Sequence, residues 1–163
     1  MNRGMAEEYL VKPIGIVISP RQDVGDDHWG GVVSTIQLDQ ETFSPDSTLG
    51  LADFSHIEVV YVFHKVATTD LVLNTEHPRE NKDWPKVGIF AQRKKNRPNR
   101  LGVSTCRLLA VNGLTITVEA LDAVDGSPVL DIKPYIQEFA PREVTHQPSW
   151  VHELMREYFT RRK

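Results

Sequence analysis

The 163-residue chain has one cysteine, Cys106, and therefore cannot form an intramolecular disulfide. A single unpaired thiol fits a reducing compartment, so we expect a cytoplasmic protein. A chain of this length buries about 70% of its unfolded surface on folding, so its core needs no disulfide bond to be stable. Because Cys106 lies in a strand-like run, we interpret it as a small core residue rather than a nucleophile, which would need a lowered pKa.

Several common motifs are missing as well. No G-x-G-x-x-G turn is present, which excludes the usual Rossmann-type cofactor site. His152 and Glu153 are followed by Arg156 where a zinc-protease helix needs its second histidine, so we predict no metal site. The longest apolar runs, 14–18 and 57–63, are strand-sized and far too short to cross a membrane.

Acidic residues are missing from one long segment. The chain carries a net charge of −3, yet residues 84–118 contain no aspartate or glutamate. Their basic residues are Lys86, Arg93, Lys94, Lys95, Arg97, Arg100 and Arg107. This segment is either an anion-binding surface or a solvated face whose counter-charges come from elsewhere in the fold, and the charge pattern alone leaves both open.

What the chain does have is a succession of short β-strand patterns. We expect strands at 14–18, 32–38, 57–63, 87–91, 102–111, 114–121 and 128–132. Asn112-Gly113 between two of them is a strong hairpin signal. Apolar residues at helical spacing after Ser149, which can cap the helix, predict one helix over about 149–161.

This arrangement defines the expected fold class. Since helices do not alternate with strands, we predict a mainly β, non-Rossmann protein. Its expected form is a single-sheet antiparallel β-barrel with the C-terminal helix packed outside. One domain would span residues 1–163, with its core at 12–140.

Three polar clusters are candidate sites. His64 and Lys65 leave the most apolar strand, where polar residues often face a pocket, although a histidine bonded at a sheet rim is the simpler alternative. The loop 92–102 carries Arg93 and further cations, which can grip carboxylates or phosphates or merely be solvated. The Asp125-Gly126-Ser127-Pro128 turn offers amides and a carboxylate for ribose or an amine, but most Asp-Gly pairs are simply turns.

Taken together and in order, these motifs resemble the TsaA-like family, also called the TrmO or YaeB-like family, of S-adenosylmethionine-dependent tRNA methyltransferases. The resemblance covers residues 12–136. Its motifs are Pro13-Ile14-Gly15, Gly50-Leu51-Ala52-Asp53-Phe54-Ser55-His56, Phe63-His64-Lys65, Gly88-Ile89-Phe90-Ala91-Gln92-Arg93, Arg97-Pro98-Asn99, Leu101-Gly102-Val103-Ser104 and the run from Asp125 to Tyr135. Two departures stand out: Arg100 replaces a proline, and Pro20-Arg21-Gln22 follows the first strand directly, where family members carry it later.

The resemblance implies a fold, a cofactor and a reaction. It implies a barrel that works as a homodimer, with S-adenosylmethionine bound near the subunit interface. It also implies methylation of N6 of the threonylcarbamoyl-modified adenosine at position 37 of tRNA. The implied cofactor-binding residues are His64, Lys65, Arg93, Leu101, Val103, Asp125, Gly126, Ser127 and Pro128.

Specific roles follow as hypotheses. We expect Arg93 to pair with the methionine carboxylate and Asp125 to bind a ribose hydroxyl or the amino group. His64 and Asp125 are the expected catalytic residues, with His64 as the base on pKa grounds. Lys94, Lys95, Arg97 and Arg100 are expected to hold RNA phosphates. Two alternatives stay open: a methyltransferase acting on a small molecule, and a non-catalytic module that binds S-adenosylmethionine.

Overall fold

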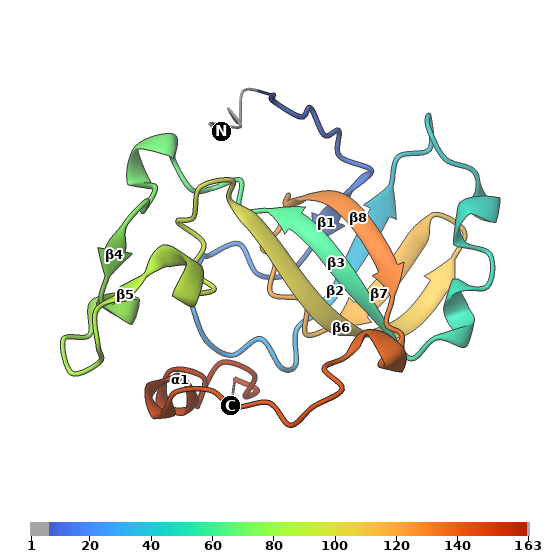
Figure 1. Cartoon of the computed structure of the whole chain (residues 1–163). Helices are drawn as coiled ribbons and strands as arrows, with labels where there is room; N and C mark the ends of the chain where they lie inside the picture. Colours follow the sequence, from blue (N-terminus) through green and yellow to red (C-terminus); the bar gives the residue numbers. More distant parts are fainter. Residues whose placement is uncertain (1–6, 163) are drawn as a thin grey trace, which may run out of the picture.

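Six antiparallel strands close into a barrel (Figure 1) in the computed structural model, which describes residues 7–162. The predicted single domain also includes residues 1–6 and Lys163, which lie outside this range. The strands are β1 (Gly15–Ile18), β2 (Val33–Leu38), β3 (His56–Val62), β6 (Leu101–Asn112), β7 (Thr115–Glu119) and β8 (Pro128–Pro134). Around the barrel their order is β1-β2-β7-β6-β3-β8, and β8 pairs with β1 to close it. The predicted mainly β barrel is therefore confirmed.

Alternation along the strands fills the barrel interior. In β3, Ile57, Val59 and Tyr61 are buried, while the residues between them are partly exposed. In β2, Ser34, Ile36 and Leu38 are buried, so the polar/apolar alternation read from the sequence places the correct face inward. The hairpin between β6 and β7 turns at Asn112-Gly113, where Gly113 has a φ of 59°. These inward faces form one continuous core.

The predicted strand at 87–91 is wrong for most of its length. Only β5 (Val87–Gly88) is extended, and it pairs with β4 (Thr75–Glu76) in a separate two-stranded sheet. Residues Ile89–Ala91 then form a 3-10 turn, whose Ile89 is buried. The β-branched residues that suggested a longer strand therefore anchor a turn. This β4–β5 pair lies outside the barrel (Figure 1).

The C-terminal helix is shorter than predicted. Helix α1 covers Ser149–Leu154, and Pro148 rather than Ser149 occupies its N-cap position. After Leu154 the chain continues in turns. The amides of Arg156, Tyr158 and Thr160 bond to carbonyls three residues earlier, as in turns rather than an α-helix, while the carbonyls of Glu157 and Tyr158 also accept hydrogen bonds from residues 28–29. As predicted, the helix lies outside the barrel (Figure 1).

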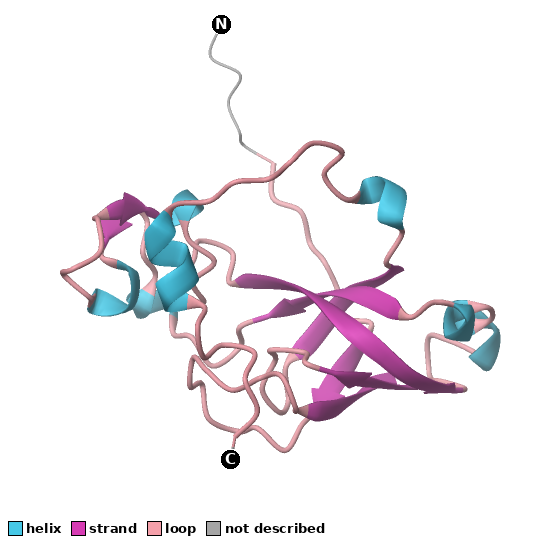
Figure 2. Ribbon diagram, turned by 90° about the horizontal axis from the view of Figure 1, so that it is seen from below, coloured by secondary structure: helices cyan, strands magenta, loops and turns pink. Residues whose placement is uncertain are grey.

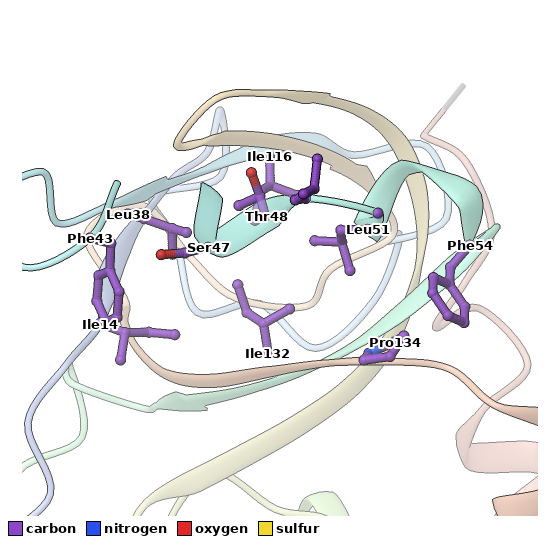
Figure 3. A pocket seen from close by; sticks show the side chains of 12 residues that line it. Ile14, Leu38, Phe43, Ser47, Thr48, Leu51, Phe54, Ile116, Ile132 and Pro134 are labelled. Atoms are coloured by element: carbon purple, nitrogen blue, oxygen red, sulfur yellow. The ribbon is translucent and has the colours of Figure 1, made fainter. Parts of the chain in front are cut away.

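The two ends of the barrel differ in character. Helical turns gather on opposite sides of the strands (Figure 2). Near the beginning of β3, 3-10 helices at Pro45–Thr48 and Leu51–Asp53 border a pocket of about 400 Å³ (Figure 3). Its lining is apolar apart from Ser47 and Thr48, and it includes no ionisable side chain. Ionisable side chains, His64 and Asp125 among them, lie instead at the other end of the barrel.

None of the helices within residues 7–162 has the length and apolarity needed to cross a bilayer.

Candidate functional site

His64 and the turn at 125–128, far apart in the sequence, meet at one rim of the barrel. His64 follows the end of β3, and a Cβ placed on Gly126 would lie 3.5 Å from the Nε2 atom of His64. Gly126 has a φ of 79°, a conformation that favours glycine. The first and third polar clusters of the sequence therefore lie side by side in the structure.

The first strand holds the acidic turn in place. The Oδ1 atom of Asp125 accepts a hydrogen bond of 3.0 Å from the amide of Ser19, and the amide of Asp125 donates to the carbonyl of Arg21 at 2.7 Å. The amide of Gly126 donates to the carbonyl of Val17 at 2.8 Å. One carboxylate oxygen of Asp125 is thus fixed by the protein, and the carboxylate has a defined orientation.

Pro20-Arg21-Gln22 belongs to this site, which the sequence analysis did not predict. Lys65 Nζ donates to the carbonyl of Gln22 at 2.5 Å, and the carbonyl of Arg21 accepts the amide of Asp125. The motif therefore lies beside Lys65 and Asp125 even though it follows the first strand earlier than the family pattern. The sequence signal for this position is the Pro20-Arg21-Gln22 motif, which family members also carry.

Arg21 is buried, with 6% of its surface exposed, and it organises the loop that follows. Its guanidinium donates to the carbonyls of Gly25 and Asp27 at 3.2 and 3.0 Å and pairs with the Asp23 carboxylate. It also lies 4.1 Å from the centre of the Trp29 ring, a cation–π distance. One side chain therefore fixes residues 23–29 against the rim.

His64 is set up to be neutral near pH 7. Its Nδ1 atom is buried and has no hydrogen-bond partner within the described chain. Burial, and then the positive charge of Lys65, lower the pKa of His64, while the carbonyl of Val62 and the charge of Asp125 act in the opposite direction. A neutral imidazole can accept a proton, and its Nε2 atom is the ring nitrogen beside the acidic turn.

The predicted RNA-binding cations all have partners inside the protein. Lys94 pairs with Glu76, and Lys95 pairs with Asp26 at 3.0 Å. Arg97 and Arg100 donate to the main-chain carbonyls of Gln92 and Val66 at 2.9 and 2.8 Å. Counter-charges for Lys94 and Lys95 thus come from elsewhere in the fold, whereas Arg97 and Arg100 bond to neutral carbonyl groups. A role in RNA binding stays a prediction.

Arg93 contacts β6 and forms no ion pair with the acidic turn within residues 7–162. Its guanidinium is exposed and donates to the carbonyl of Val103 on β6. Leu101 and Val103 are 38% and 45% exposed, on the outer face of the same strand. The contacts of Arg93, Leu101 and Val103 are thus on the outer face of β6, and the single chain shows no hydrogen bond between Arg93 and Asp125 within residues 7–162.

Asp122, three residues before Asp125, is a second residue that sequence reasoning missed. Its carboxylate accepts hydrogen bonds from the hydroxyls of Tyr61, Ser104 and Tyr158, with the Tyr61 bond at 2.9 Å and the Tyr158 bond at 2.5 Å. Burial, together with this carboxylate, raises the pKa of both tyrosines, so they remain donors. Through these three hydrogen bonds the Asp122 carboxylate links β3, β6 and the C-terminal segment.

Cys106 is excluded as a nucleophile. It is 1% exposed in the barrel core, and burial raises the pKa of its thiol to about 12, with the charge of Asp122 acting in the same direction. The interpretation of this cysteine as a core residue is therefore confirmed.

Fold and site together define a closed, non-Rossmann β-barrel with a histidine and an acidic turn at one rim. A family model, the tRNA-methyltransferase O N-terminal domain, matches residues 18–140. The chain belongs to this family, which confirms the resemblance.

Relatives agree with that assignment. A probable S-adenosyl-L-methionine-binding protein of Pyrococcus abyssi is 37% identical over 136 residues, covering 81% of this chain and 71% of that protein. The mouse tRNA (adenine(37)-N6)-methyltransferase is 39% identical over 93 residues, but these cover 57% of this chain and only 21% of the mouse protein. A crystal structure of TrmO from Pseudomonas aeruginosa superimposes with a TM-score of 0.71 at 23% identity, covering 88% of this chain and 62% of that one, and shows the same fold.

Proposed function

We propose that this protein is an S-adenosylmethionine-dependent methyltransferase acting in the cytoplasm on N6 of threonylcarbamoyl-adenosine 37 of tRNA. The observation that carries the proposal is the meeting of His64, Lys65 and the Asp125 turn at one barrel rim. Relatives named as tRNA (adenine(37)-N6)-methyltransferases or as S-adenosyl-L-methionine-binding proteins support it.

The residues at the rim fit the cofactor. Asp125 Oδ2 has no hydrogen-bond partner in the part of the chain that the structure describes, and His64 Nε2 lies beside Gly126 at the rim, so both atoms can meet polar groups of a ligand. We assign Asp125 to a ribose hydroxyl or to the amino group, and Arg93 to the methionine carboxylate. Leu101, Val103 and the backbone of the 125–128 turn complete the proposed binding set.

When bound, S-adenosylmethionine supplies a methyl group on a sulfonium, which is transferred by in-line displacement. The protein's task is alignment and exclusion of water, which can account for roughly 7–11 kcal/mol of a barrier. His64 is the residue that we assign to accept the proton from N6, because its lowered pKa keeps the imidazole neutral at physiological pH.

The basic loop is the proposed contact for tRNA phosphates, with Lys94, Lys95, Arg97 and Arg100 as the cations. Lys94 and Lys95 are 26% and 31% exposed and are held by carboxylates, so their Nζ atoms have fixed positions. An RNA strand would share these cations with Glu76 and Asp26. Contacts of this kind make affinity depend on salt concentration.

Transfer of a labelled methyl group tests the proposal directly. The purified protein is incubated with labelled S-adenosylmethionine and either total tRNA or an extract of small molecules. We expect label in tRNA that carries the threonylcarbamoyl group and none in tRNA that lacks it. Label in the small-molecule extract alone would overturn the proposed substrate. Cofactor binding without methyl transfer to either substrate would show that the protein is a binding module rather than a methyltransferase.

We further propose a homodimer with the cofactor near the interface. It is supported by the exposed Leu101 and Val103 beside Arg93, and by the absence of an ion pair between Arg93 and Asp125 within residues 7–162. A second copy would cover this apolar face.

A charge placed on this face is therefore expected to break the dimer. In sedimentation experiments the wild type should be a dimer and Val103→Glu a monomer with weaker cofactor binding, because a carboxylate is costly to bury. Ile18→Glu, on the outer face of β1 and 54% exposed in the single chain, is the matched control and should remain dimeric. A dimeric Val103→Glu would show that this face is not the interface.

A further inference from the structure

The C-terminal segment contacts the site although it lies beyond the residues matched by the family model. That match ends at residue 140, whereas α1 and the turns after it occupy residues 149–162. Figure 1 shows this segment on the side of the barrel that carries the β4–β5 pair. Its contacts lead to Asp125 by two separate routes.

The first route passes through the main chain of residues 28–30. The amides of His28 and Trp29 donate to the carbonyls of Glu157 and Tyr158 at 3.0 and 2.8 Å. Nδ1 of His28 also lies 2.8 Å from Oγ1 of Thr160. Gly30 approaches the backbone of Phe159 so closely that a Cβ there would collide with it. The two segments are therefore tightly packed.

Residues 27–29 in turn hold Arg21. The guanidinium of Arg21 donates to the carbonyl of Asp27 and lies over the ring of Trp29. The carbonyl of Arg21 accepts the amide of Asp125. This route thus runs from the C-terminal segment through a buried arginine to the acidic turn.

The second route is shorter. Tyr158 donates its hydroxyl to Oδ2 of Asp122, whose Oδ1 is held by Tyr61 and Ser104. Asp122 lies three residues before Asp125 in the same connection between β7 and β8. Losing the Tyr158 hydroxyl would leave one oxygen of a half-buried carboxylate without its protein partner, and such a loss loosens the segment that carries it.

We propose that Tyr158 is a positioning residue: the C-terminal segment is a strap that fixes the Asp122–Asp125 connection and thereby orients Asp125 toward the cofactor. The inference rests on the proposed function for its ligand, but the strap itself is defined by contacts within the chain. Tyr158 does not need to touch the cofactor, because it acts through Asp122.

Tyr158→Phe removes the hydroxyl and keeps the ring. We expect the dissociation constant for S-adenosylmethionine, measured by calorimetry, to rise about tenfold, the size of one lost hydrogen bond to a charged group. In methyl transfer the KM for the cofactor should rise while kcat at saturating cofactor stays near the wild-type value. Amide hydrogen exchange in the connection between β7 and β8 should become faster.

Tyr135→Phe is the matched control, because Tyr135 follows β8 and its amide bonds to His56 at the opposite end of the barrel. It should bind the cofactor like the wild type. Gly30→Ala is a second variant, which displaces the strap at Phe159 without touching the hydroxyl, and it should weaken binding in the same way.

The possible failures are distinguishable. If the wild type binds no S-adenosylmethionine, the proposed function is wrong, and the exchange measurement still tests the strap. If the wild type binds and Tyr158→Phe shows unchanged affinity and exchange, the strap proposal is overturned. A fall in kcat at saturating cofactor with unchanged KM would also overturn it, because the residue would then act on the chemical step.

Discussion

Replacing His64 with glutamine is expected to lower the rate of methyl transfer at saturating cofactor by about 100-fold, the usual size of a general-base contribution. Burial and the neighbouring Lys65 lower the pKa of His64 in the folded protein. Its neutral, proton-accepting form therefore persists as the pH falls to the ordinary histidine value of 6.5 and is lost only below it. The acid limb of the pH–rate profile should lie below pH 6.5 in the wild type and disappear in His64→Gln.

Single-turnover measurements with bound cofactor separate this effect from binding. His146→Gln alters an exposed histidine outside the site and should keep both the rate and the acid limb. If His64→Gln transfers methyl groups at the wild-type rate, His64 is not the general base. The same conclusion would follow if the acid limb survived the substitution.

Replacing Arg21 with leucine is expected to destabilise the protein by about 3 kcal/mol, because several charge-assisted hydrogen bonds are lost at once. The guanidinium is 6% exposed and bonds to the carbonyls of Gly25 and Asp27. Arg21→Lys should restore little of this, since one ammonium cannot span acceptors that a planar guanidinium reaches together. Urea denaturation would measure both losses.

Arg142→Leu provides the comparison for Arg21→Leu. Arg142 is exposed and forms no ion pair within residues 7–162, so its replacement should leave the free energy of unfolding within about 0.5 kcal/mol of the wild type. A stable Arg21→Leu protein with wild-type cofactor affinity would show that the loop at 23–29 does not depend on this side chain.

The barrel was predictable because its signals are local. Alternation in residues 33–38 and the Asn112-Gly113 turn each determine structure over a few residues. The strand expected at 87–91 failed because the same β-branched residues can anchor a turn when a neighbouring segment supplies a buried site for Ile89. Helix α1 is shorter than predicted because the residues after it form tight turns that pack against residues 28–30, a tertiary contact without a local signal.

The site was predictable only in part. His64 and the turn at 125–128 were found as separate clusters and joined by family resemblance, and the structure brings them together. The partners of Lys94 and Lys95 lie 18 and 69 residues away, and no local pattern identifies them. The buried roles of Arg21 and Asp122 were missed for the same reason, because a buried charged residue is recognised by its acceptors and donors, which only the fold brings near.

The closure of the barrel between β1 and β8 has a consequence for how the protein becomes active. Ser19 and Asp125 are 106 residues apart in the sequence, and their hydrogen bond forms only when these two strands meet. Long-range pairings of this kind carry a loop-closure entropy that short-range hairpins do not. A chain whose barrel is open between β1 and β8 therefore lacks this hydrogen bond and the orientation that it gives to Asp125.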